Sequence, residues 1–169
     1  MKAILSVLSA IALLASPAFA SESVTIAYPT TDDASFLITA PEDWELDPAE
    51  EPDGYFDLTG PTGAVFSFRT IKGTESALEQ AIKESVEEAN DMFADVQLGE
   101  AMDWTPDGLE GFYAVGDAKD KEDGTPIRIG MAWCALKDGR IAEMWFSAEA
   151  ADTEGLEAAN KIANSLRSP

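Results

Sequence analysis

The sequence predicts a single α+β domain: a mostly antiparallel β-sheet of about six strands with helices packed on its faces. Three observations predict this class. The hydrophobic period changes along the chain between two and about 3.6, in the order strands, helix, strands, helix. A long hairpin near the C-terminus is apolar on both of its faces. A second amphipathic helix then closes the chain.

The strongest strand signal lies in residues 125–148, TPIRIGMAWCALKDGRIAEMWFSA. Two apolar, β-branched and aromatic runs flank the turn Lys137–Arg140, and its Asp-Gly pair favours a hairpin. Neither strand has a polar face of the kind found in a sheet with one side in water. We therefore expect this hairpin to be the centre of the sheet, with both faces at least partly covered.

Shorter alternating runs predict the remaining strands. They lie at residues 24–28, 35–39, 55–59, 64–70, around 96–98 and at 109–115. The turn Gly60–Gly63 joins two of these runs into a second hairpin, and residues 104–108 form another turn. The acidic, proline-rich residues 41–54 and the charged residues 117–124 are expected to be loops.

Two helices are predicted from their apolar stripes. The first covers residues 76–93, where Ser76 and Glu79 fit a capping box. The second follows a cap at Asp152 or Thr153 and continues to Leu166. The stripe residues are Leu78, Ile82, Val86, Ala89 and Phe93 in the first helix, and Leu156, Ala159, Ile162, Ala163 and Leu166 in the second.

Residues 1–20 read as a secretory signal peptide. Lys2 precedes an apolar run that is shorter than the roughly 20 residues needed to span a bilayer, and the pattern Ala18-Phe19-Ala20 predicts cleavage after Ala20. Ser21 follows where a lipoprotein would need cysteine. We expect a periplasmic or secreted protein with one domain at residues 21–169 and no stable membrane anchor.

The charge of the domain is strongly negative. The whole chain carries −21, and without Lys2 the mature chain has 10 basic and 32 acidic residues, a net charge of −22. Binding of nucleic acid is excluded, because it requires a basic surface, and anionic lipid is disfavoured for the same reason. The acidity indicates either a surface for cations or basic partners, or a solvated coat; the scattered acids favour the coat.

The sequence predicts no catalytic, cofactor-binding or metal-binding residue. The chain has no histidine, which removes histidine-based triads and makes transition-metal sites improbable. Cys134, the only cysteine, lies among apolar residues and is expected to be buried and inert. Acids are so abundant that paired carboxylates carry no information.

Calcium is the one metal for which a local candidate exists, in the acids before Gly124. Lysines at positions 119 and 121 stand where the first ligands of a calcium loop belong, so we interpret this segment as a solvated loop. The acids concerned are Asp117, Asp120, Glu122 and Asp123.

Two segments resemble a known superfamily. The run Phe36–Trp44, FLITAPEDW, is similar to the strand and Pro-x-x-Trp opening of PsbP-like and DcrB-like proteins, and Ala158–Leu166 is similar to their closing helix. The resemblance implies an α/β/α sandwich and a non-enzymatic auxiliary or binding role, in a superfamily that also includes a Ran-GTPase-binding protein. Physically, Pro41 is expected to stop the strand, and Trp44 to fold back over a sheet edge.

The resulting hypothesis is an exported, non-enzymatic binding or accessory protein. Its partner is an unknown envelope protein or a small ligand. One alternative is a chaperone-like assembly factor for envelope proteins, which would need an open apolar groove; another is a hydrolase that uses only carboxylates. Candidate surface aromatics near loops are Tyr28, Trp44, Tyr55 and Trp104, each of which also suits core or rim packing.

Overall fold

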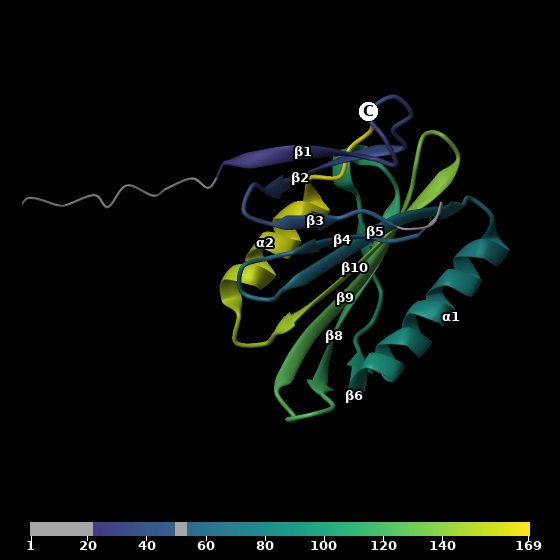
Figure 1. The fold of residues 1–169 in the computed structure, drawn as a ribbon. Helices are drawn as coiled ribbons and strands as arrows, with labels where there is room; N and C mark the ends of the chain where they lie inside the picture. The colour runs from purple at the N-terminus through teal and green to yellow at the C-terminus, as the bar shows by residue number, and fades with distance from the viewer. Residues whose placement is uncertain (1–21, 50–53) are drawn as a thin grey trace, which may run out of the picture.

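Ten β-strands and two α-helices make up the part of the chain that the structure, a computed structural model, describes: residues 22–49 and 54–169 (Figure 1). The predicted signal peptide, residues 1–20, lies outside the described residues. Within those ranges, neither helix is both long enough and apolar enough to cross a membrane.

The main sheet has eight strands, more than the predicted six or so, and every pairing in it is antiparallel. Their order is β3-β4-β5-β10-β9-β8-β6, and β7 also pairs with β8. The bounds are β3 Glu45–Asp47, β4 Phe56–Thr59, β5 Val65–Lys72, β6 Phe93–Leu98, β7 Met102–Trp104, β8 Gly111–Asp120, β9 Pro126–Ala135 and β10 Arg140–Glu149.

The central hairpin is confirmed. Strands β9 and β10 lie in the middle of the sheet, with Trp133 opposite Glu143 and Ala132 opposite Met144. Because successive side chains point to opposite faces, Ile129, Met131 and Trp133 lie on one face and Ala132 and Cys134 on the other. Both faces are covered, which is why neither has a polar pattern.

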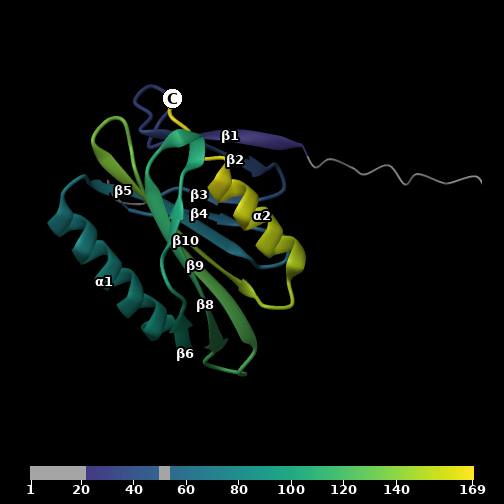
Figure 2. The same cartoon turned by 180° about the vertical axis from the view of Figure 1, so that it is seen from behind.

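A helix packs on each face, which confirms the α/β/α arrangement. Helix α1, Glu75–Met92, covers the face that carries Ile129 and Trp133, and helix α2, Thr153–Asn164, covers the opposite face. Both views show the sheet between the two helices (Figures 1 and 2). A separate antiparallel ribbon of β1, Ser23–Tyr28, and β2, Phe36–Pro41, lies beside α2 in the same layer. Strand β2 ends at Pro41, as predicted.

The helix caps differ in how well the sequence predicted them. The Asp152 side chain caps α2 by accepting from the Gly155 amide at 2.9 Å. The Ser76–Glu79 capping box was wrong, because α1 begins earlier and the Thr74 hydroxyl accepts from the Ala77 amide at 3.3 Å. The third position after the true cap is alanine, which cannot complete a box.

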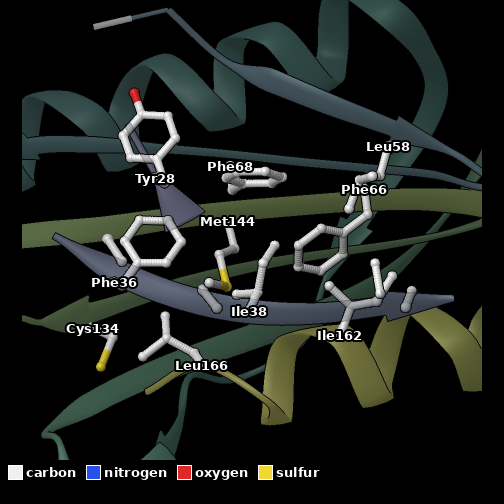
Figure 3. Close-up of a cluster of buried hydrophobic side chains, with 14 of the residues drawn as sticks. Tyr28, Phe36, Ile38, Leu58, Phe66, Phe68, Cys134, Met144, Ile162 and Leu166 are labelled. Carbon is white, nitrogen blue, oxygen red and sulfur yellow. The ribbon is translucent and has the colours of Figure 1, made fainter. Parts of the chain in front are cut away.

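The larger core lies between the sheet, α2 and the β1–β2 ribbon (Figure 3). Aromatic rings from three strands meet there: Tyr28 stacks on Phe36 at 5.3 Å between centroids, and the edge of Phe36 meets Phe68 at 6.0 Å. Ile162 and Leu166 close this core from the C-terminal side. Burial of so many large apolar side chains is the main stabilising contribution to the fold.

The C-terminal residues after α2 are bound to β2. Arg167 pairs with Leu37 through two backbone hydrogen bonds, and its guanidinium donates to the Thr39 hydroxyl at 3.0 Å. The Thr39 amide in turn donates to the Ser165 hydroxyl at 2.7 Å. The last residues of the domain therefore complete the sheet layer formed by its first strands.

Candidate binding site

A hollow of about 610 Å³ lies between α2, the segment 103–107 and the central strands. Its volume falls in the range of about 300–1,000 Å³ that is typical of ligand pockets. Apolar groups form most of the wall, including the buried Phe66, Ala132, Met144 and Ala159. A second hollow, of about 460 Å³, lies between α1 and β5 and is lined by Arg69, Ala81 and Glu84 among others.

The space exists because small residues face each other across it. Ala159 and Ala163 of α2 lie opposite Gly130 and Ala132 of β9, where larger side chains would fill the core. Gly130 has a specific role: a Cβ atom at this position would overlap the ring of Phe146. The glycine thus lets Phe146 lie close against the strand and keeps the hollow open.

Trp104 and Tyr113 form the outer wall. Trp104 is half-buried, and its indole N–H donates to Oδ1 of Asn164 at 3.0 Å, which ties β7 to the end of α2. The Tyr113 hydroxyl lies 3.7 Å from the sulfur of Met102, whose side chain is 43% exposed. The apolar surface therefore continues from the hollow onto β7, outside the cavity itself.

The charged residues in the lining are Asp103 and Asp107, both exposed to water, and no lysine or arginine lines the hollow. Asp103 borders it with its backbone: it pairs with Phe112 in the β7–β8 ladder, so its side chain lies on the α1 face of the sheet, opposite to that of Trp104. Asp107 accepts a hydrogen bond from the Ser168 amide at 3.3 Å. Within residues 22–49 and 54–169, the side chain of Asp103 makes no hydrogen bond or ion pair.

Of the four candidate aromatics, only Trp104 lines this hollow. Tyr28 is a core residue whose hydroxyl donates to the Gly54 carbonyl at 3.3 Å. Trp44 is buried against Gly60, directly after β4. Tyr55 lies on the other side of the sheet, where its ring stacks under the guanidinium of Arg69 at 4.4 Å.

Apart from the hollow, a polar cluster lies under α1 around Glu143, a fully buried carboxylate. One of its oxygens accepts from Arg69 Nε at 2.6 Å. The other accepts from the Ser85 hydroxyl at 2.9 Å and from the Trp133 indole N–H at 3.1 Å. This saturation of the carboxylate explains how a charge is tolerated in the core.

The surroundings of Glu143 affect the neighbouring titratable groups. Burial raises the pKa of the Tyr55 phenol, and the negative charge of Glu143 raises it further. Arg69 keeps its charge: burial by itself would lower its pKa, but the hydrogen bond to Glu143 and the electrostatic attraction of Tyr55, Glu143 and Glu84 together outweigh that effect, and the net shift is upward. Because Ser85 and Glu143 are both buried, this cluster holds α1 on the sheet and offers no access to a substrate.

The sequence analysis missed Glu143. The available signal was one acid inside the apolar run Arg140–Ala148, at a position that alternation assigns to a covered face. A buried acid requires partners. Those partners come from β5, α1 and β9, and only the register of the sheet brings them together.

The acids considered for calcium are not arranged around one point. Asp117 belongs to β8, which continues to Asp120 and shortens the predicted loop 117–124. Asp117 accepts from Arg128 at 2.6 Å, and Asp120 accepts from the backbone amides of Glu122 and Asp123. Among the described residues, no group of three or more acidic or cysteine side chains could hold a metal ion.

Cys134 is buried, as predicted, on the α2 side of the sheet (Figure 3). Its side chain is 1% exposed, and burial raises the pKa of the thiol to about 11. A thiol that stays protonated at neutral pH is a poor nucleophile.

Comparison with known proteins supports the fold. No protein-family model matches the chain, and no curated protein matches it by sequence. The solution structure of CyanoP, the cyanobacterial PsbP of Synechocystis, is similar over 91% of this chain and 96% of that protein, with a TM-score of 0.64 and 11% identity.

Three further solved structures are similar. LpqN of Mycobacterium tuberculosis, which is involved in cell envelope biogenesis, matches 88% of this chain and 91% of its own, with a TM-score of 0.57 and 13% identity. The Ran-binding protein Mog1p of Saccharomyces cerevisiae matches 88% and 96%, with a TM-score of 0.55 and 12% identity. A Bacteroides thetaiotaomicron protein matches 80% of this chain at 19% identity with a TM-score of 0.52, but this match spans 45% of that protein.

These likenesses confirm the PsbP-like fold that residues 36–44 and 158–166 had indicated. Identities of 11–19% establish a shared fold and leave the function to be argued from the site.

Proposed function

We propose that the protein is exported and acts in the cell envelope as a non-enzymatic accessory protein, which binds a partner protein in the hollow between α2 and β7–β8. The observation that carries this proposal is the hollow itself: a space of about 610 Å³ with aromatic walls, kept open by small residues on two facing elements. Concave, mostly apolar sites of this size are the usual places for binding.

Export is supported by residues 1–20, whose charged start, short apolar run and Ala18-Phe19-Ala20 pattern are typical of a signal peptide. A partner protein is supported by analogy. One neighbour in fold is a Ran-binding protein and another takes part in cell envelope biogenesis. The exposed Met102 beside the hollow extends the apolar surface beyond what a small ligand would cover.

A binding role fits the chemistry of the hollow better than hydrolysis does. A hydrolase that relies on carboxylates needs one of them in an apolar setting, where it can stay protonated as the general acid. The two acidic residues of the lining, Asp103 and Asp107, are both exposed to water, and the Asp103 side chain lies on the opposite face of the sheet. The buried carboxylate, Glu143, is enclosed on the other face of the sheet.

Site-specific photo-crosslinking in the source cell tests the proposal. The photoreactive residue p-benzoylphenylalanine would replace Thr105 or Asn160, which are exposed and line the hollow. Matched controls would carry it at Glu79 or Gln80, exposed positions on α1 on the opposite side of the sheet.

We expect one envelope protein to be crosslinked from positions 105 and 160 and not from the α1 positions. This crosslink should disappear when Trp104 is changed to alanine. Many different proteins crosslinked from the hollow would instead favour the chaperone-like assembly factor, because such a factor covers apolar segments of several clients. Equal crosslinking from both sides, or none from the hollow, would refute the proposed site.

A further inference from the structure

Strand β1 has an open edge. In the described part of the chain it pairs with β2 alone, and the other side of β2 is paired with Arg167. In both views β1 lies at the margin of the molecule (Figures 1 and 2). An open edge presents backbone N–H and C=O groups to which another extended segment can bind.

The register identifies the residues of β1 whose backbone groups face outward. Thr39 of β2 points its backbone away from β1, because its amide donates to the Ser165 hydroxyl at 2.7 Å. Thr25 is the partner of Thr39 in the ladder, and pairs in an antiparallel ladder alternate between bonded and non-bonded. This pair is non-bonded, so the N–H and C=O of Thr25 face away from β2. Those of Ser23 and Ala27, two residues to either side, face the same way.

The other edge strands of the described part carry features that hinder pairing with a further strand. Strand β3 has three residues, of which Glu45 and Asp47 are acidic, and β7 also has three. The pairing of β6 is irregular between Ala94 and Gln97. Strand β1, in contrast, has six residues without a charge, a proline or a bulge. It is therefore the edge best suited to accept a strand.

The guanidinium of Arg167 extends across the ribbon to this edge. It donates to the Thr39 hydroxyl at 3.0 Å and to the Thr25 hydroxyl at 3.3 Å, and a third bond goes to the Ser165 carbonyl at 3.1 Å. It lies on the face turned away from the core, because Ile38, next to Thr39, points into the core. These bonds use three of the five N–H donors of a guanidinium.

The cation has no acidic partner in the described part of the chain. None of the ion pairs there includes Arg167, although the whole chain carries 32 acidic residues. Its hydrogen bonds to the ribbon already fix its position. A carboxylate that approached the β1 edge beside Thr25 would therefore meet a positioned guanidinium with donors to spare.

We propose that the edge of β1 binds an extended segment of a partner protein, which adds a strand to the ribbon and places one carboxylate beside Thr25 and Arg167. The residues before and after this acid point to the other face of the ribbon, beside Val24 and Ile26, and are apolar. Val24 is 42% exposed, so the contact removes apolar surface from water. This site is separate from the hollow and goes beyond the proposed function.

Charge favours a foreign segment over a second copy of this chain. Two β1 strands paired about Thr25 would bring two Arg167 guanidinium groups to one place. They would also join two mature chains that each carry a net charge of −22. The proposed cleavage after Ala20 leaves too few residues ahead of β1 to cover its edge from within the chain.

The test uses the purified, ¹⁵N-labelled mature protein and three peptides with blocked ends, Thr-Thr-Val-Xaa-Val-Thr-Thr. Xaa is glutamate, glutamine or lysine. The flanks are uncharged because acids lie at both ends of the ribbon, Glu22 and Glu42 at one and Asp32 and Asp33 at the other. Chemical shifts of the backbone amides report both the position of binding and the dissociation constant.

We expect the largest shifts at the outward-facing amides of β1. The glutamate peptide should bind about two- to fivefold more tightly than the glutamine peptide, in line with exposed ion pairs, and the lysine peptide should bind most weakly. The glutamate peptide methylated on its backbone nitrogens cannot pair with a strand and should not bind.

Point variants separate the backbone contact from the charge. Thr25→Pro removes an outward-facing N–H from an edge strand, where proline is tolerated, and should abolish binding of all three peptides. Thr25→Val, the matched control, keeps that N–H and should keep binding. Arg167→Gln should remove the preference for glutamate and leave binding of the glutamine peptide unchanged. Melting temperatures within about 2 °C of the parent would show that these variants fold.

Several outcomes would overturn the inference: no shifts at β1, binding of the methylated peptide, unchanged binding in a folded Thr25→Pro protein, or equal binding of the glutamate and lysine peptides. A dimer of the mature protein in sedimentation, dissociated by Thr25→Pro, would make a second copy the occupant and would also overturn it. The crosslinks at positions 105 and 160 test the hollow independently, so either site can fail while the other stands.

Discussion

Both faces of the sheet carry an apolar cluster, but the α1 face adds a buried polar one. Under α1, one buried carboxylate, Glu143, joins three elements by accepting from Arg69 of β5, Ser85 of α1 and Trp133 of β9. Under α2, large apolar side chains such as Phe36, Phe66 and Ile162 make the contact, with a hollow beside them. Hydrogen bonds fix the position of a helix through distance and angle, whereas apolar packing tolerates small residues and space.

This difference indicates which face is free to evolve a binding site. A shift of α1 would break the hydrogen bond from Ser85 to the buried Glu143 carboxylate, so the position of α1 on the sheet is constrained. On the other face, the small residues Gly130, Ala159 and Ala163 stand where larger side chains would fill the core. Small residues there reduce the apolar contact area, but they do not deprive a buried polar group of its partner. The hollow lies on that second face.

The largest expected effect is on the α1 face. Changing Glu143 to alanine leaves Arg69, Ser85 and Trp133 without their common acceptor, and we expect the free energy of unfolding to fall by about 3–5 kcal/mol. Urea unfolding followed by circular dichroism measures it. Glu149→Ala, at the exposed end of the same strand, should stay within about 0.5 kcal/mol of the parent. A loss below about 1 kcal/mol for Glu143→Ala would show that the cluster contributes little.

Alkaline pH should lower the free energy of unfolding, because Cys134 is buried on the α2 face as a protonated thiol. The thiol has a pKa of about 11 in the folded protein, above its ordinary value of 9.0, so the unfolded chain ionises first as pH rises. Stability is therefore fully present below about pH 9 and is lost between about pH 9 and 11, by at most about 3 kcal/mol.

Cys134→Ala separates this loss from other titrations. Tyr55, whose pKa is also raised, contributes alkaline loss in both proteins, so the difference between their urea-unfolding curves isolates the thiol. We expect the variant to be less stable than the parent at about pH 8, and the gap to narrow by about pH 10.5. Parallel pH profiles would contradict a buried, protonated thiol.

A smaller effect is expected where the hollow borders β9. In Gly130→Ala the new methyl group overlaps Phe146, which must move, and we expect a loss of about 1–3 kcal/mol together with a smaller hollow. Thermal unfolding measures the loss of stability, and crosslinking of the partner from position 105 reports the smaller hollow. Ala135→Val, at the exposed end of the same strand, adds atoms without a clash and should affect neither. Unchanged crosslinking in Gly130→Ala would mean that Phe146 does not shape the site.

The smallest expected differences between the two faces concern the N-terminal caps of the two helices. Asp152 accepts from the Gly155 amide and also from the Thr62 hydroxyl at 2.6 Å, whereas Thr74 makes one longer bond at 3.3 Å. Asp152→Ala should cost about 1–2 kcal/mol and Thr74→Ala about 0.5–1 kcal/mol, as measured by urea unfolding. The reverse order would show that the bond to Thr62 adds nothing.

Local sequence was sufficient for the parts of the fold that have their own periodicity. The hairpin of β9 and β10 and both amphipathic helices were predicted close to their observed bounds, because their apolar spacing is strong. Strands β3 and β7 were predicted as loop and turn. Each has three residues and forms through backbone bonds to a neighbouring strand, which no local pattern encodes. The C-terminal half of β8 was missed because its charged side chains resemble a loop.

The candidate site was less predictable. Trp104 was named beforehand because of its position near a turn, but the hollow requires α2 and β9 to present small residues at the same place. That alignment depends on how the helix sits on the sheet. Glu143 likewise became interpretable only when the register placed Trp133 opposite it.

The bond between Arg167 and Leu37 has a consequence for the order of folding, because it joins two segments that lie far apart in the sequence. The entropy of closing so long a loop is lost before such a contact stabilises the chain. The β1–β2 ribbon is therefore expected to dock late, after the local hairpin of β9 and β10 has formed.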